Sequence, residues 1–233
     1  MTPSKRVAIV QSCYIPWKGY FDLIRDVDEF ILFDDVQFTK RDWRSRNRIK
    51  TPQGLLWLSV PVQTKGKYLQ AIKDTKVSDP SWNEQHWRTI STHYAKAPFF
   101  AKYRDSLAAL YAECTDTHLS QNNRRLTEGL CGMLGIPTKL SWSSDYIVIP
   151  GKTERLVSLC QQANATEYLS GPAARDYLQP ELFEQAGITL RYADYAGYPE
   201  YPQLYPPFEH FVSVIDLLVS VGPDALSFMR PLR

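Results

Sequence analysis

Short apolar runs enclose an amphipathic segment at the start of the chain. Residues 7–10, VAIV, form a continuous apolar run of the kind found in buried strands, and residues 30–33, FILF, form a second one. Between them, residues 20–24, YFDLI, place their apolar side chains at helical spacing. A strand, a helix and a second strand within about thirty residues have the size of one βαβ unit. The pattern therefore predicts a parallel sheet.

A hairpin and three helices are predicted next. Residues 44–50 and 55–62 favour strands, and a Thr-Pro-Gln-Gly turn separates them. The whole segment 81–135 has helical periodicity. It opens with residues 81–84, SWNE, which fit a capping box, and it ends at Gly135.

Strands and helices alternate again after this helical segment. We predict strands at 136–140, 166–170 and 188–192, and helices at 153–163, 181–185 and 208–221. In the last helix we expect these apolar side chains to face inward: Phe211, Val214, Ile215 and Leu218. The sequence therefore predicts one α/β domain over residues 1–233. Its core is a Rossmann-like, mostly parallel sheet, with a helical insertion at about 81–135.

Composition narrows the classes of function. The formal net charge is only +2, so no nucleic-acid partner is expected. No apolar run approaches the length of a membrane span, and the N-terminus lacks a signal-peptide pattern, so we expect a cytoplasmic protein. The four cysteines are scattered without any C-x-x-C spacing, which predicts free thiols and no metal site. Oligomeric state stays open.

The loops 11–19 and 34–43 each follow a predicted parallel strand. Ligands of such sheets bind beyond the carboxyl ends of the strands, so we expect the active site where these loops meet. Asp34 and Asp35 end the second strand and point to opposite faces, so at most one of them faces a ligand. Asp35 is our candidate general base, with a structural ion pair to an arginine as the alternative.

Cys13 and His93 are two further catalytic candidates. Cys13 lies just past the first strand, close to a predicted helix N-terminus that would stabilise a thiolate. His93 stands at the end of a predicted helix and is the histidine that we pair with Cys13, or that acts alone as a base. A passive cysteine and a packing histidine are the alternatives.

Residues 40–50 carry six basic groups. Arg44, Arg46 and Arg48 follow one another at a spacing of two, which puts them on one face of an extended chain beside Trp43. Three guanidinium groups beside an indole suit a phosphate or pyrophosphate with a stacked ring. The alternative is an edge strand that is charged to prevent aggregation.

Further polar and aromatic residues are candidate substrate contacts, although none forms a motif by itself. They are Gln11, Tyr14, Trp17, Asp34, Gln37, Arg41, Asn47, Asn123, Ser144, Gly171, Tyr177 and Gln203. The sequence contains no Walker A, GxGxxG, GxSxG or HExxH motif, so ATP or NAD chemistry of those types has no support.

Several segments in the same order resemble the WbqC-like protein family. They include QSCYIPWKGYFDLI, DDVQF, RNRIK, WLSVPV, HYAKAPFF, LGIPTKLSWSS and YLSGPAARDYL. The resemblance implies a role in bacterial surface-polysaccharide (O-antigen) biosynthesis, on a nucleotide-linked amino sugar. It implies transfer of an acyl or aminoacyl group to the amine from a carrier-protein phosphopantetheine thioester or from coenzyme A. Some members carry His in place of Val10 and Asn in place of Cys13, which weakens Cys13 as a nucleophile.

A second likeness is confined to PWKGYFDLI, which is similar to the first strand–helix turn of the nucleotidylyltransferase superfamily. There a histidine-bearing loop opens the helix, whereas Tyr20 occupies the position of one histidine here. The alternatives to an acyltransferase are therefore a nucleotidylyltransferase-like enzyme and a non-catalytic module that binds a sugar nucleotide or a carrier protein.

Overall fold

Five parallel strands form the central sheet of the computed structural model, which describes residues 4–231. In sheet order they are β5 (Lys139–Trp142), β2 (Glu29–Leu32), β1 (Arg6–Val10), β6 (Glu167–Ser170) and β7 (Thr189–Tyr192). The chain builds outward from β1 to β2 and β5, then crosses to the other side of β1 for β6 and β7. The order therefore reverses between β1 and β6, which is where sheets of this kind bind ligands.

The sheet is covered on both faces, as its apolar strands require. One face contributes Ala8, Phe30 and Leu32 to a core shared with α1 (Lys18–Arg25) and α4 (Leu119–Leu134). The opposite face contributes Val7, Ile9 and Ile31 to a core shared with α5 (Thr153–Gln162) and α6 (Pro180–Gln185). Successive strand residues alternate between the two cores because strand side chains alternate in direction. The predicted Rossmann-like α/β fold is confirmed.

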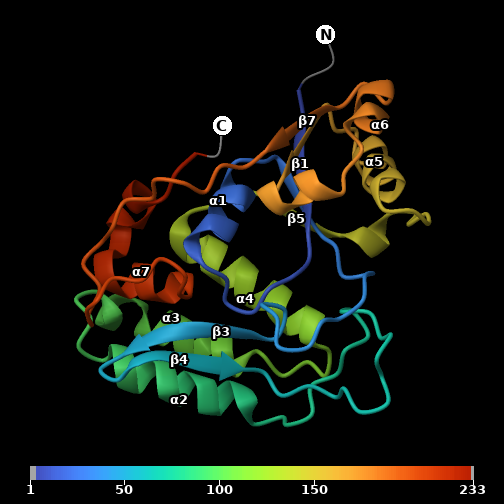
Figure 1. Cartoon of the computed structure of the whole chain (residues 1–233). Helices are drawn as coiled ribbons and strands as arrows, with labels where there is room; N and C mark the ends of the chain where they lie inside the picture. The colour runs from blue at the N-terminus through green and yellow to red at the C-terminus, as the bar shows by residue number, and fades with distance from the viewer. Residues whose placement is uncertain (1–3, 232–233) are drawn as a thin grey trace.

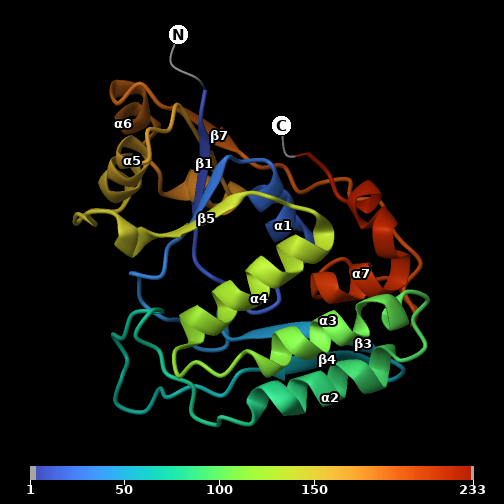
Figure 2. The ribbon, with the colours of Figure 1, turned by 180° about the vertical axis from the view of Figure 1, so that it is seen from behind.

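A second layer lies below the sheet in Figure 1. Strands β3 (Arg46–Thr51) and β4 (Gly54–Ser59) form an antiparallel hairpin. The hairpin packs with α2 (Trp82–Tyr94), α3 (Phe100–Ala112) and α7 (Val214–Val221) in the same core as α1 and α4. Figure 2 shows α4 running between this layer and the sheet. The three helices α2 to α4 lie within the predicted helical insertion.

Three local predictions need correction. The last helix begins only at Val214, where the Ser213 side chain accepts a hydrogen bond from the Ile215 amide, so Phe211 is not helical and is 53% exposed. Ser81 forms no capping box because its hydroxyl donates to Asp79 instead. The strand predicted at 136–140 lies at 139–142, after the left-handed Gly135 ends α4.

Candidate functional site

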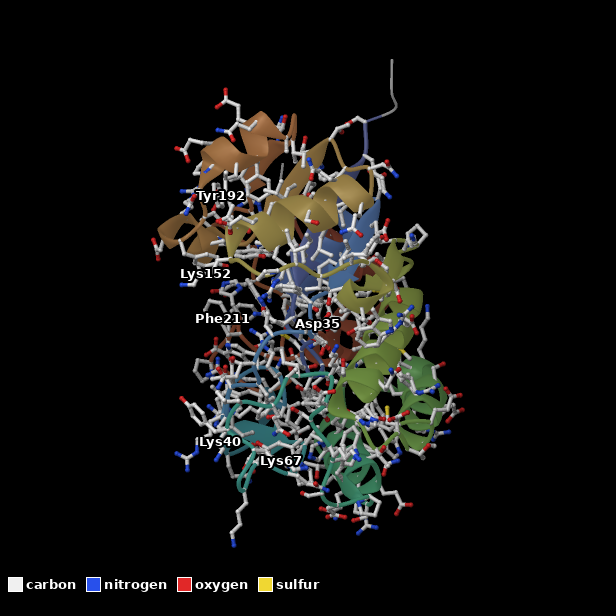
Figure 3. All side chains as sticks on the ribbon, turned by 90° about the vertical axis from the view of Figure 1, so that its right-hand side faces the viewer. Asp35, Lys40, Lys67, Lys152, Tyr192 and Phe211 are labelled. Atoms are coloured by element: carbon white, nitrogen blue, oxygen red, sulfur yellow. The ribbon has the colours of Figure 1, made fainter. Side chains whose placement is uncertain are left out.

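A cavity of about 780 Å³ opens at the carboxyl ends of β1 and β6. The loop after β1, residues 11–17, forms one wall, and residues 168–174, around the end of β6, form another. Residues 151–156 at the start of α5, the residues Trp43, Arg44 and Asn47 before and within β3, and the side chains of Tyr177, Tyr195 and Phe211 also contribute to the lining. Figure 3 shows Lys152 and Phe211 on the same flank of the molecule. The cavity therefore occupies the point where the strand order reverses.

The loop 11–17 is held in one conformation by backbone and amide contacts. The Tyr14 amide donates to the Trp43 carbonyl, and the Val214 amide donates to the Pro16 carbonyl. Asn47, whose side chain also lines the cavity, donates to the carbonyl of Ile15 at 2.9 Å. Ile15 has φ of +34°, a left-handed conformation that strains a β-branched residue. Several independent contacts thus hold a strained loop at the cavity wall.

Cys13 and Arg44 face each other in the cavity. Arg44 Nη1 lies 2.7 Å from Cys13 Sγ as a donor, and Arg44 Nε lies 3.7 Å from Asp42. Burial nevertheless raises the pKa of the Cys13 thiol to about 11, more than the Arg44 charge lowers it. The thiol is therefore protonated at neutral pH, and the predicted stabilised thiolate is wrong.

The predicted partner of Cys13 lies elsewhere. His93 occupies the last turn of α2, where its carbonyl accepts a hydrogen bond from the Tyr205 hydroxyl. It does not belong to the described residues that line the cavity. The proposed Cys13–His93 pair is therefore not formed, because the helical insertion carries His93 into the layer of α2 and the hairpin.

Asp34 and Asp35 lie in a turn after β2 ends at Leu32, they have different partners, and neither lines the cavity. Asp34 is buried, accepts hydrogen bonds from the Ser12 amide and the Ser120 hydroxyl, and has a pKa raised by burial. Asp35 accepts a hydrogen bond from the Ser143 hydroxyl and lies 2.5 Å from Lys73. Asp35 is therefore not part of the cavity wall, and its ion pair is to a lysine instead of an arginine. Figure 3 places Asp35 away from Lys152 and Phe211.

The arginine cluster divides between two places. Arg44 precedes β3 and lines the cavity, whereas Arg46 and Arg48 lie on the outer face of the hairpin. Arg48 donates to the Phe211 carbonyl at 3.2 and 2.9 Å, and the Arg46 guanidinium lies 4.1 Å from the centre of the Trp57 ring. The expectation of three guanidinium groups on one face is therefore wrong, because Arg44 belongs to the turn before the strand.

Some of the other predicted substrate contacts line the cavity, and the rest lie elsewhere in the protein. The cavity wall includes Gln11, Cys13, Trp17, Trp43, Arg44, Asn47, Gly171 and Tyr177. The side chains of Tyr14, Asn123 and Gln203 are instead engaged within the protein, with His86, Ser12 and Asp216 among their respective partners. Gln37 binds the Tyr68 carbonyl, and Arg41 and Ser144 are exposed outside the cavity.

Lys152 and Arg155 are site residues that the sequence patterns did not single out. They stand one turn apart at the start of α5, and both line the cavity. Arg155 Nε donates to the Ile149 carbonyl at 2.8 Å, and its guanidinium lies 5.8 Å from the centre of the Phe33 ring. A signal was present in PGKTER, where a glycine turn and two cations open a predicted helix. Tyr195 and Phe211 were missed because they come from the long loop before α7.

The charges of the cavity all have one sign. Its cations are Arg44, Lys152 and Arg155, and the described lining residues include no Asp, Glu or His. Trp17 and Trp43 supply aromatic surface. Such a cavity suits an anionic ligand that carries a ring. In residues 4–231 no three His, Cys, Asp or Glu side chains gather to hold a metal ion.

One comparison with known proteins identifies a family. The profile of the WbqC-like protein family matches residues 11–228. The chain is 53% identical over 229 residues, 98% of this chain and 99% of the other, to "Uncharacterized protein Rv1507c" from Mycobacterium tuberculosis. No solved structure matches significantly. No helix within residues 4–231 is long and apolar enough to cross a membrane. On the match over nearly its whole length, the chain belongs to the WbqC-like protein family.

Proposed function

We propose that the protein transfers an acyl or aminoacyl group to the amine of a nucleotide-linked amino sugar, in the biosynthesis of a bacterial surface polysaccharide. One observation carries the proposal: the cavity between β1 and β6 is lined by cations and aromatic rings, without a described carboxylate. A sugar nucleotide offers a pyrophosphate to the cations and rings to the aromatic side chains.

Each wall of the cavity has a part in this proposal. Arg44, Lys152 and Arg155 bind the pyrophosphate, and Trp17 and Trp43 pack against the sugar or the base. The Gln11 side chain lines the cavity and makes no hydrogen bond within residues 4–231, so its amide is free to donate. We assign that amide to the oxyanion that forms when the amine attacks the donor carbonyl.

The donor in this proposal is a thioester of coenzyme A or of a carrier protein's phosphopantetheine arm. The deprotonated amine attacks the thioester carbonyl, a C–N bond forms and the C–S bond breaks. The thiolate leaves, and the amine proton passes to solvent or to the departing thiolate. Positioning of the two substrates is the main contribution of the protein, since well-oriented reactants gain several orders of magnitude in rate.

A non-catalytic module that binds a sugar nucleotide is the second candidate. The absence of Asp, Glu and His from the described lining favours it, because no side chain of those types is in place to accept a proton. The two candidates bind the same class of ligand and differ only in turnover.

A two-step experiment tests both candidates. First, melting temperatures are measured with nucleotides and nucleotide-linked sugars, with and without an amino group, because a ligand that binds the folded state raises the melting temperature. Second, the best ligand is incubated with acyl-coenzyme A or an acyl-carrier protein, and the product is weighed by mass spectrometry. We expect stabilisation by the amino-sugar nucleotide and a mass gain of one acyl group.

Matched variants separate the outcomes. Arg155→Gln removes a cavity cation, whereas Arg88→Gln removes an exposed cation on α2 and serves as the control. Binding without product from any donor supports the binding module. Failure of every sugar nucleotide to stabilise the protein overturns both candidates.

A further inference from the structure

Two tryptophans and two arginines form a second aromatic and cationic surface, which shares only Trp43 with the cavity. Trp43 and Trp57 are 41% and 42% exposed, and their ring centres lie 5.5 Å apart. The guanidinium of Arg48 lies 5.9 and 5.5 Å from the two ring centres. The guanidinium of Arg46 lies 4.1 Å from the centre of the Trp57 ring. We call these four residues the tryptophan–arginine platform.

The two arginines of the platform differ in their partners. Arg48 is fixed by two hydrogen bonds to the Phe211 carbonyl. Arg46 has a buried Nε without an acceptor, and its guanidinium makes no hydrogen bond or ion pair within residues 4–231. A buried donor without an acceptor is costly, and a guanidinium is a preferred group for binding phosphate. Arg46 is therefore a cation that is ready for an external anion.

The nearby carboxylates do not neutralise Arg46. Asp42 accepts a hydrogen bond from the Trp43 amide and lies 3.7 Å from Arg44. Glu209 accepts a hydrogen bond from the Phe211 amide. Both acids hold the backbone around the platform, so the charge of Arg46 stays unmatched.

The platform adjoins the mouth of the cavity. Trp43 belongs to both surfaces, and Phe211, which holds Arg48, also lines the cavity. The Trp43 carbonyl accepts a hydrogen bond from the Tyr14 amide. This bond connects the platform to the loop after β1. A ligand on the platform therefore lies beside a ligand in the cavity.

We propose that the platform binds a nucleoside phosphate, with its base packed on the two indoles and its phosphate on Arg46. Indoles stack on any base, and a guanidinium binds phosphate oxygens in a bidentate manner. The nucleoside phosphate has two sources under the proposed function, namely the head group of coenzyme A or the nucleotide half of the sugar nucleotide. With the second source, the one pyrophosphate lies between Arg46 and the cavity cations. The choice between these two sources rests on the proposed function, whereas the binding of a nucleoside phosphate at the platform does not.

The experiment is an equilibrium titration of the full chain at low salt with coenzyme A, with UDP and with dTDP. It compares the wild type with Arg46→Gln and Trp57→Ala. We expect Arg46→Gln to weaken binding of the platform ligand by about ten- to a hundredfold, since it removes a charge-assisted hydrogen bond. We expect about tenfold or more from Trp57→Ala, which removes a stacking surface. Added salt should weaken wild-type binding more than Arg46→Gln binding.

Controls keep the result specific to the platform. Tyr68→Ala removes an aromatic side chain that is 78% exposed on a different loop, and it should bind like the wild type. Arg46→Lys keeps the charge and should retain more affinity than Arg46→Gln. If the melting curve shows that Trp57→Ala fails to fold, the comparison of Arg46→Gln with Arg46→Lys and the wild type is the test.

The two sources give different outcomes. Loss of coenzyme A affinity alone assigns the platform to the acyl donor, and loss of UDP or dTDP affinity alone assigns it to the sugar nucleotide. Unchanged affinity of both platform variants, or no binding of any of the three ligands at millimolar concentration, overturns the proposal. Because the readout is binding, an absence of acyl transfer would overturn only the proposed reaction.

Discussion

The cavity and the buried Asp216 carboxylate of α7 both contain charged groups, but they differ in whether the protein itself supplies the partners of that charge. Asp216 is fully buried and accepts hydrogen bonds from the Tyr94 hydroxyl at 2.7 Å, the Tyr201 hydroxyl at 2.8 Å and the Gln203 amide at 3.0 Å. We call these four residues the Asp216 cluster. The cavity contains cations whose charge no described lining carboxylate matches.

This difference distinguishes polar groups that stabilise the fold from polar groups that are available to a ligand. In the Asp216 cluster a carboxylate meets three donors from the protein, so a ligand has nothing to add. In the cavity, Lys152 and Arg155 make no ion pair within residues 4–231 and leave positive charge for an anion from outside, whereas Arg44 lies 3.7 Å from Asp42. Unmatched charge at a cavity wall, more than polarity itself, marks the binding site. Gln203, which the sequence suggests as a substrate contact, belongs to the structural cluster.

The largest effect is expected from Asp216→Ala. The change leaves the buried hydroxyls of Tyr94 and Tyr201 without their acceptor, whereas the Gln203 amide keeps the Glu209 carbonyl. We expect a loss of about 3–5 kcal/mol in the free energy of unfolding. Urea denaturation measures it, and Asp216→Asn, which keeps one acceptor, should lose less. Ligand affinity per folded molecule should not change. A loss below about 1 kcal/mol would contradict the structural role of the cluster.

The next effect is a pH dependence of stability at His86, in a second buried network. The Tyr14 hydroxyl forms hydrogen bonds with His86 Nδ1 at 2.6 Å and with the Tyr111 hydroxyl at 2.9 Å. Burial lowers the pKa of His86 from 6.5 to about 4. The folded state therefore favours neutral His86, and its contribution is present above pH 6.5 and lost as pH falls through 4.

The lowered pKa of His86 corresponds to about 3 kcal/mol of pH-dependent stability, because each tenfold change in proton affinity is worth about 1.4 kcal/mol. Unfolding curves at pH 7 and pH 4 measure it for the wild type and for His86→Phe, which has no group to titrate at that position. The variant should show a smaller pH dependence by about that amount. Equal pH dependence in both proteins would remove His86 as the cause.

A smaller effect, confined to binding, is expected from Arg44→Gln in the cavity. We expect the affinity for a nucleotide-linked sugar to fall by about ten- to a hundredfold, since one charge-assisted contact is lost. Isothermal titration calorimetry measures the change, with Arg88→Gln as the exposed control. Unchanged affinity would mean that the positive charge of the cavity does not select the ligand.

The smallest effect is expected from Asp35→Asn. Asp35 is engaged with Lys73 and Ser143 outside the cavity, so nucleotide-sugar affinity and acyl transfer should stay within about twofold, with a stability loss near 1 kcal/mol. Turnover rates and urea curves check the two parts. A tenfold loss of turnover at full affinity would return Asp35 to the mechanism.

The order of the elements was predictable because apolar runs bounded by turn residues determine it. The site was predictable only in part. The loop after β1 forms a wall of the cavity as expected, since β1 is a central parallel strand. The opposite wall comes from the ends of β6 and from α5, and local sequence patterns do not reveal that β6 pairs with β1. The prediction therefore favoured the neighbouring strand β2, and with it Asp35.

Side-chain direction was the other part that the sequence left open. Tyr14 and Trp17 look alike as aromatic residues of one polar loop, yet Tyr14 is fully buried against His86 and Trp17 lines the cavity. The left-handed backbone at Ile15 lies between them. A β-branched residue gives no sequence signal for such a conformation, because it rarely adopts it.

The pairing of β1 with β6 also has a consequence for synthesis on the ribosome. Arg6 lies opposite Glu167 in the sheet, so one edge of β1 emerges long before its partner. At elongation rates of about 5–20 residues per second the wait is roughly ten to thirty seconds. The hairpin and helices α2 to α4 emerge during this interval and can cover only the face that includes Ala8. The nascent chain therefore exposes Val7 and Ile9 until α5 follows, and this apolar face is where we expect a ribosome-associated chaperone to bind.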